Sequence, residues 1–389
     1  MRLDPLKPDL SVVLPCLNEE DTLGTCLQKL LKVSTENNFR LEVIVADNGS
    51  TDNSVSIASS FGARIVNVKS IGYGSALISG IKEAQAPFIL MADADDSYDL
   101  LDTPKFYEAL QKGYELVQGC RLSGGGGKIA KGAMPWSHKY IGNPMFTHLV
   151  QSWFKSPVND VYCGMRAFTK NFYQSLNMKS QGMEFATEMI IKAANLKANT
   201  FEIPITLHKD GRIQHPPHLK TFRDGWKTLR FFFICAPAKL FLLPGIIMII
   251  LGLIGNFMGY NEIKLGTATL GIHTMLGSAL FVICGVQAVL MHSLSNQLTA
   301  RLNKSDVVAQ KKINLINSKK ITGISFIMLI IGIMTWLIVF WNWFESGFSE
   351  LDYSKTFKLV VPGTTLICLF FQYMFFSFFR TWLTYESSE

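Results

Sequence analysis

The sequence contains few cysteines, seven in 389 residues, and no paired C-x-x-C spacing. Structural zinc sites and disulfide frameworks both depend on paired cysteines at short, regular intervals, so the sequence predicts neither. An odd number also fits free thiols in a reducing compartment. These thiols are Cys16, Cys26, Cys120, Cys163, Cys235, Cys284 and Cys368.

The N-terminus lacks the apolar core that a cleavable signal peptide requires. Residues 1–9 instead contain Arg2, Asp4, Lys7 and two prolines. We therefore expect no cleaved leader, and we expect the N-terminal part of the chain to stay in the cytoplasm.

Long apolar runs are missing from the first 230 or so residues but dominate the rest of the chain. Four runs lie at about 237–258, 271–294, 321–344 and 359–379. Because a helix rises ~1.5 Å per residue, about 20 apolar residues cross a hydrocarbon core of ~30 Å. The sequence predicts a membrane domain of four transmembrane helices over residues 237–389. Buried helices of a globular domain are the alternative.

Lysine and arginine are sparse in the connections 259–270 and 345–358, and they are frequent before the first predicted span and between the second and third. By the positive-inside rule, this asymmetry places the N-terminal domain and both termini in the cytoplasm. The formal net charge of +7 is then explained by a membrane partner, and we expect no nucleic-acid partner.

The N-terminal part alternates strand-like and helix-like segments. Apolar strand candidates occupy 10–14, 43–46, 64–68 and 88–92, and the segments 19–33, 53–61 and 75–84 between them have helical patterns. This β-α alternation predicts an α/β domain over residues 1–211 with a mostly parallel sheet and helices on both faces.

A basic, aromatic segment separates the two predicted domains. Its helical part places Phe222, Trp226, Leu229 and Phe233 on one face and basic residues elsewhere. An amphipathic helix of this kind lies in the membrane interface, so we assign residues 212–236 to an interface region.

Four carboxylates follow the apolar run 88–91, namely Asp93, Asp95, Asp96 and Asp99. Ligands of open α/β sheets bind at the carboxyl ends of the strands, and carboxylates crowded at such an edge repel one another. A divalent cation relieves that repulsion, so the cluster is a candidate metal site. Turn formation and helix capping are the alternative roles for these residues.

Polar strand ends, the turn Gly72-Tyr73-Gly74 and the sequence Asp93-Ala94-Asp95 together resemble the family 2 glycosyltransferases of the GT-A fold. Four spans after the catalytic domain resemble, within that family, the polyprenyl-phosphate glycosyltransferases, which include dolichol-phosphate mannose synthases. The resemblance covers essentially the whole chain. It implies a Rossmann-like domain that binds a nucleotide sugar.

The resemblance also implies nucleotide contacts at the first two strand ends. Pro15 and Glu19 match the segment that holds base and ribose, whereas Leu17 replaces the usual aromatic residue. Asp47 matches the residue that reads the base, and Asn48 departs from the family pattern. For Asp47, helix capping is the competing role.

Metal and phosphate contacts are implied in the same way. Asp93 and Asp95 would hold Mg²⁺ or Mn²⁺ against the diphosphate of the donor, with Ser97 near the usual third ligand. Arg121 stands where the family places an arginine facing phosphate. Lys139 stands near the position of the family's second phosphate-facing cation. The alternative is a solvated surface charge.

A later segment resembles the family's sugar-side motif and places Asp160 beside the sugar, braced by Arg166. We take Asp95, Asp160 and Arg121 as the catalytic set. Glu184 and Glu188 share one helix face, where one contacts acceptor or sugar, or both are solvated.

Basic residues before the interface helix, among them Arg212 and Lys220, would bind the acceptor phosphate or simply attract anionic lipid. A lipid monophosphate is largely a dianion at pH 7, so it needs no strong general base. Positioning and charge compensation are then the contribution of the protein.

The sequence therefore predicts inverting, metal-dependent transfer of a hexose from a nucleotide diphosphate sugar, with UDP-glucose favoured, to a polyprenyl or dolichyl monophosphate at the cytoplasmic membrane face. A processive polysaccharide synthase would carry Gln-x-x-Arg-Trp, which this sequence lacks, and a non-catalytic scaffold would be expected to lose Asp93 and Asp95. A transporter would show charge at mid-membrane depth. The resemblance suggests self-association through the last spans, which the sequence leaves open.

Overall fold

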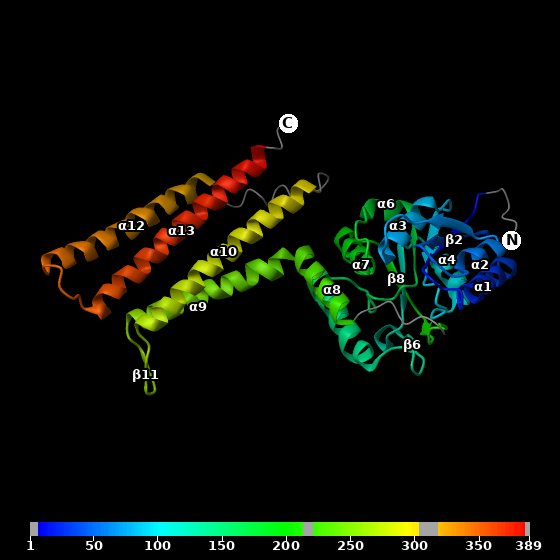
Figure 1. The fold of residues 1–389 in the computed structure, drawn as a ribbon, viewed down its shortest axis with the longest axis horizontal. Helices are drawn as coiled ribbons and strands as arrows, with labels where there is room; N and C mark the ends of the chain where they lie inside the picture. The colour runs from blue at the N-terminus through cyan, green and yellow to red at the C-terminus, as the bar shows by residue number, and fades with distance from the viewer. Residues whose placement is uncertain (1–6, 213–220, 303–317, 386–389) are drawn as a thin grey trace. The chain divides into compact units, whose positions relative to one another are not determined.

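Two units make up the chain, residues 1–232 and residues 233–389. The structure is a computed structural model and describes residues 7–212, 221–302 and 318–385. Figure 1 shows both units, coloured along the chain.

A seven-stranded sheet with the order β3-β2-β1-β4-β7-β5-β8 forms the centre of the N-terminal unit. Strands β1 to β4 pair in parallel, β5 is parallel to β8, and β7 runs antiparallel between β4 and β5. The strands are β1 (Leu10–Cys16), β2 (Leu41–Asp47), β3 (Arg64–Asn67), β4 (Phe88–Met91), β5 (Leu116–Cys120), β7 (Arg166–Thr169) and β8 (Thr200–Pro204). This confirms the predicted mostly parallel α/β fold.

Helices cover both faces of this sheet. The helices of this domain are α1 (Leu23–Glu36), α2 (Ser54–Ser60), α3 (Tyr73–Glu83), α4 (Thr103–Gln111), α5 (Asn143–Phe154), α6 (Lys170–Leu176) and α7 (Glu184–Leu196), and α8 (Thr221–Cys235) follows the domain along the chain. On one face, α1, α2 and α4 share a core with the strands. On the other, α3 comes so close that a Cβ on Gly80 would lie 2.5 Å from Cγ1 of Val13. A short ladder of β6 (Lys128–Ile129) and β9 (Thr206–Leu207) lies apart from the main sheet.

The register of the strands brings three strand ends together. Cys16 pairs with Asp47, and Val13 pairs with Met91. Asp93 therefore stands about level with Pro15, at the carboxyl edge of the parallel strands, where α/β sheets bind ligands.

The described residues of the C-terminal unit form four long apolar helices. They are α9 (Leu243–Tyr260), α10 (Ile272–Leu302), α12 (Ser318–Glu345) and α13 (Tyr353–Tyr385), with the hairpin β10 (Lys264–Leu265) and β11 (Ala268–Thr269) between α9 and α10. By length and composition, the segments Ala238–Tyr260, Ile272–Gln297, Ile321–Glu345 and Tyr353–Trp382 are each able to cross a membrane. The four predicted spans are confirmed to that extent.

Small residues let these helices approach one another closely. The buried residues of α9 are Gly245, Gly252 and Gly259, which are seven apart and face α10. In lipid, where apolar burial drives little association, such close backbone packing holds helices together.

Leu30 and Leu31, neighbours on α1, test the core assignment. Leu30 is fully buried, whereas Leu31 is 38% exposed. We expect Leu30→Ala to lower the free energy of unfolding by about 2–5 kcal/mol, because it leaves a cavity. Leu31→Ala should change it by less than about 1 kcal/mol. Denaturant unfolding of the N-terminal unit, followed in the detergent-purified chain, measures both, and equal losses would contradict this packing.

Candidate active site

A cavity of about 680 Å³ lies at the carboxyl edge of the parallel strands. Residues from the segments 15–19, 71–76, 93–95 and 181–184 line it, and Asn48, Asp210, Arg212 and Lys227 complete its wall. The strand ends singled out by the sequence thus meet in one pocket.

Asp93 and Asp95 both line this cavity, and each is held by a hydroxyl group. The Tyr73 hydroxyl donates to Oδ1 of Asp93 at 2.8 Å. Ser97 donates to Oδ1 of Asp95 through its hydroxyl at 2.6 Å and its backbone N–H at 3.0 Å. Burial, and then the neighbouring charge of Asp95, raise the pKa of Asp93 to about 6. The two carboxylates lie close enough for the charge of one to disfavour ionisation of the other.

These two carboxylates fit a divalent cation. Mg²⁺ binds proteins through one or two carboxylates and takes its other ligands from water and phosphate oxygens. Among the residues that the structure describes, no cluster of three or more His, Cys, Asp or Glu side chains is arranged to hold a metal without such help. Because the Ser97 hydroxyl donates to Asp95, it already has a role in orienting that carboxylate.

Arg212 lies at the acid pair. Its guanidinium donates to both oxygens of Glu19, with distances of 2.5 to 3.1 Å, and Nη1 lies 3.5 Å from Oδ2 of Asp95. Asp210 is a weaker partner at 3.7 Å. The side chains of Arg212 and Glu19 are only 12% and 5% exposed. This arginine therefore offsets the negative charge of Glu19 and Asp95.

The nucleotide-side predictions fall into two groups. Pro15 and Glu19 line the cavity, whereas Asp47, the last residue of β2, does not. Asp47 accepts hydrogen bonds from the N–H groups of Gly49 and Ser50 at 3.2 and 3.1 Å, which hold the turn after β2. It does not cap α2, whose N-cap is Asn53. Asn48, and not the predicted Asp47, lines the cavity.

The turn at the start of α3 and the segment before α7 contact each other at one side of the pocket. A Cβ on Gly72 would lie 2.3 Å from the carbonyl oxygen of Gln181, and one on Gly74 equally close to that of Ser180. The Ser75 N–H donates to the Gln181 carbonyl at 3.0 Å. Two stretches of chain over 100 residues apart therefore build one wall.

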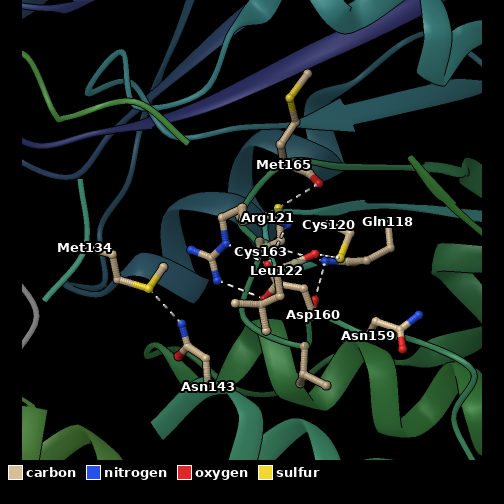
Figure 2. Close-up of polar contacts among 12 residues, drawn as sticks. Gln118, Cys120, Arg121, Leu122, Met134, Asn143, Asn159, Asp160, Cys163 and Met165 are labelled. Atoms are coloured by element: carbon tan, nitrogen blue, oxygen red, sulfur yellow. Dashed lines mark hydrogen bonds and ion pairs between the residues drawn. The ribbon is translucent and has the colours of Figure 1, made fainter. Parts of the chain in front are cut away.

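Arg121 and Asp160 form a buried ion pair beside a second cavity (Figure 2). Nε and Nη2 of Arg121 donate to the two carboxylate oxygens at 2.8 and 2.9 Å, and its backbone N–H adds a bond of 2.9 Å. Although burial opposes it, Asp160 holds the pKa of Arg121 well above its usual value. The second cavity, of about 400 Å³, is lined by Arg121 and also by Lys139.

Tyr98 connects the two sites. Its hydroxyl accepts from Nη1 of Arg121 at 3.5 Å and from the backbone N–H of Gly164 at 2.8 Å. Gly164 in turn lies against Asp93, because a Cβ there would come within 2.6 Å of Oδ2. The loop from Asp160 to Gly164 thus spans the distance from the ion pair to the acid pair.

Comparison with known proteins identifies the family. The pattern described as "Glycosyl transferase family 2" matches residues 11–176, and "Glycosyltransferase family 2 C-terminal transmembrane region" matches residues 294–384. The "Low-salt glycan biosynthesis hexosyltransferase Agl6" of Haloferax volcanii is 31% identical over 376 residues, which cover 96% of this chain and 88% of that protein. The chain belongs to glycosyltransferase family 2. Its predicted family and glycosyltransferase activity are confirmed.

Further similarities cover the N-terminal unit. A "Dolichyl-phosphate hexose transferase" of Haloferax volcanii is 31% identical over 199 residues, 51% of this chain and 82% of that one. Among solved structures, a glucosyl-3-phosphoglycerate synthase from Mycobacterium tuberculosis, in complex with Mn²⁺, UDP and glucosyl-3-phosphoglycerate, is 19% identical with a TM-score of 0.46. That similarity covers 59% of this chain and 80% of the other.

In this glycosyltransferase the predicted site residues separate into two cavities. Pro15, Glu19, Asp93, Asp95 and Arg212 surround the first. Arg121 and Lys139 line the second, with Asp160 paired to Arg121. Lys220 lies outside the described residues.

Arg166 braces backbone rather than the carboxylate of Asp160. Its guanidinium is fully buried and donates to the carbonyl oxygens of Val161, Cys163 and Ala186, at 2.7 to 3.3 Å. It therefore ties the Asp160 loop to the first turn of α7.

Sequence reasoning missed two contacts of this site. Nothing in the sequence pairs Arg212 with Glu19, which are 193 residues apart, or places Gln181 against the Gly72 turn. Tyr73 carried a local signal, since it stands between two glycines at the start of a predicted helix.

Glu188 offers a test of how the pocket wall is held. Its carboxylate accepts from the N–H groups of Lys179 and Ser180 at 2.8 to 3.1 Å and pairs with Lys192 at 2.7 Å. In Glu188→Gln an amide replaces one acceptor oxygen. Hydrogen bonds to charged groups contribute about 1.5–3 kcal/mol, so amides 179–183 should exchange about 10-fold faster or more.

Hydrogen exchange of the detergent-purified chain measures this change directly. Glu108→Gln, on the exposed side of α4, is the matched control and should leave exchange in that segment unaltered. Unchanged exchange at 179–183 in Glu188→Gln would show that another contact holds the wall.

Proposed function

We propose that this glycosyltransferase moves a hexose from a nucleotide diphosphate sugar, with UDP-glucose favoured, to a polyprenyl or dolichyl monophosphate. The observation that carries the proposal is the pair Asp93 and Asp95, which faces a cavity at the carboxyl edge of the sheet in a chain with four membrane-length helices. The relative named a dolichyl-phosphate hexose transferase supports a lipid phosphate as acceptor.

The donor occupies the first cavity in this proposal. Its base and ribose lie along Pro15, Glu19 and Asn48, and its diphosphate lies by Asp93 and Asp95. A bound Mg²⁺ or Mn²⁺ would neutralise the negative charge that develops on the leaving nucleotide diphosphate. Asp93 and Asp95 would hold the ion, and Arg212 and Lys227 add positive charge to the same cavity.

In this proposal the acceptor phosphate approaches along a basic stretch of the chain, residues 121–159. The sequence from Arg121 to Asn159 contains no Asp or Glu but includes Lys128, Lys131, Lys139 and Lys155. Anionic lipid is attracted to such a stretch. Because the lipid phosphate is already largely a dianion, the protein has only to place it in line with C1 of the sugar. Direct displacement inverts the anomeric centre.

Placement in the cell follows from charge. We propose a catalytic domain over 1–211, an interface region over 212–236 and a membrane domain over 237–389, with the catalytic domain and both termini in the cytoplasm. The support is the excess of lysine and arginine in the segments before the first span and between the second and third. In the interface region, Trp226 is 68% exposed, as a residue at a lipid boundary would be.

A lipid-product assay tests this function. The detergent-purified chain is given undecaprenyl or dolichyl phosphate, Mn²⁺ or Mg²⁺, and labelled UDP-glucose, UDP-galactose, UDP-GlcNAc or GDP-mannose, one donor at a time. A labelled lipid that disappears with chelator supports acceptor and metal and names the donor. Donor hydrolysis without labelled lipid would keep the donor site and overturn the acceptor.

Asp95→Asn should lower lipid labelling by about 100-fold or more, because it removes one charge from the metal site at almost constant shape. Asp102→Asn is the matched control, since Asp102 pairs with exposed Lys105 at the start of α4. It should keep near-normal activity. Near-normal activity of Asp95→Asn itself would rule out the metal assignment.

Arg212 lies in the wall of the donor cavity, and we propose that it binds the acceptor phosphate from there. Arg212→Ala should then raise the apparent KM for the lipid by about 10-fold or more, and by more than the KM for the nucleotide sugar. Arg40→Ala is the control, because Arg40 pairs with Asp9 and lies outside both cavities. A larger rise in the donor KM would instead assign Arg212 to the donor.

A further inference from the structure

Tyr73 is the first residue of α3, and its side chain reaches into the donor cavity beside the acid pair. Its hydroxyl lies 2.8 Å from Oδ1 of Asp93. Within the described part of the chain, this is the one side-chain hydrogen bond recorded for the Asp93 carboxylate. The orientation of Asp93 therefore depends on the central residue of the Gly72-Tyr73-Gly74 turn.

The backbone of Tyr73 is fixed on both sides. The preceding Gly72 has φ +144°, and its N–H donates to Oδ1 of Asn48 at 2.7 Å. The following Gly74 packs against the carbonyl of Ser180, where a side chain would not fit. Asn48 is also tied to the Ser70 carbonyl at 2.8 Å. The hydroxyl is thus presented to Asp93 from a turn with little freedom to move.

The second oxygen of Asp93 is confined as well. Oδ2 lies against Gly164, where a Cβ would come within 2.6 Å. Rotation of the carboxylate is therefore limited by the Tyr73 hydroxyl at one oxygen and by the Gly164 backbone at the other. Asp95 has a comparable support from Ser97.

We propose that Tyr73 is a positioning residue of this glycosyltransferase, whose hydroxyl orients Asp93 for binding a divalent cation. The inference rests on the proposed metal site. Groups that orient metal ligands through a hydrogen bond are typically worth about 10–100-fold in metal affinity. A purely structural tyrosine at this place would leave metal affinity unchanged when its hydroxyl is removed.

Tyr73→Phe removes one oxygen atom and keeps the ring. The experiment titrates the full chain in detergent with Mn²⁺ in the presence of UDP and follows free Mn²⁺ by electron paramagnetic resonance. The Kd for Mn²⁺ should rise about 10–100-fold in the variant. Tyr114→Phe is the matched control, because Tyr114 stacks on Phe201 and lines neither cavity, and it should bind as the wild type does.

Steady-state kinetics give an independent reading. In Tyr73→Phe the Mn²⁺ concentration for half-maximal transfer should rise by the same factor, while kcat at saturating Mn²⁺ returns to within a few-fold of wild type. Wild-type Mn²⁺ affinity in Tyr73→Phe would overturn the role of Tyr73 and leave the metal site intact. A wild-type protein that binds no Mn²⁺ or Mg²⁺ would overturn the metal site and this inference with it.

Discussion

Repulsion among carboxylates in a half-buried pocket is the constraint on which the rest of this site depends. Asp93, Asp95 and Glu19 meet at one sheet edge because parallel strands deliver their carboxyl ends to the same place. Each is compensated by a group from elsewhere in the chain: Tyr73 for Asp93, and Arg212 for both Glu19 and Asp95. A cation bound as we propose would relieve the repulsion that these contacts leave between the carboxylates.

Charge is separated along the chain. Acidic groups gather at the ends of β1 and β4, whereas the stretch 121–159 contains none. The Asp160–Gly164 loop joins the two regions, since Arg121 holds one end of it and Asp93 lies against the other. The metal-bound donor and the anionic lipid acceptor that we propose would be favoured by local potentials of opposite sign, and this separation of charge lies within one unit.

Much of this architecture could be predicted from the sequence, because its signals are local. Apolar runs followed by acidic or amide side chains mark strands β1, β2 and β4, and runs of more than 20 mostly apolar residues mark the membrane helices. Strand β7 could not be predicted in this way. It is four residues long and enters the sheet between β4 and β5, out of chain order.

Side-chain contacts were harder to predict, because the partners lie far apart in the sequence. Arg121 was predicted to face phosphate, but only the fold shows that its nearest partner is Asp160, 39 residues later. The Arg212 contact with Glu19 spans most of the N-terminal unit. Motif spacing predicts contacts between residues close in sequence, so it does not predict contacts over such separations. Residue type alone predicts only the sign of the charge at each position.

The wall made by Gly72, Gly74 and the segment 180–182 has a consequence for biosynthesis. These stretches meet only after the chain has been made at least as far as Glu188, whose carboxylate holds residues 179 and 180. A nascent chain shorter than this has the acid pair but no closed pocket around it. A chain that ends before Glu188 therefore lacks one wall of the cavity that Asp93 and Asp95 face.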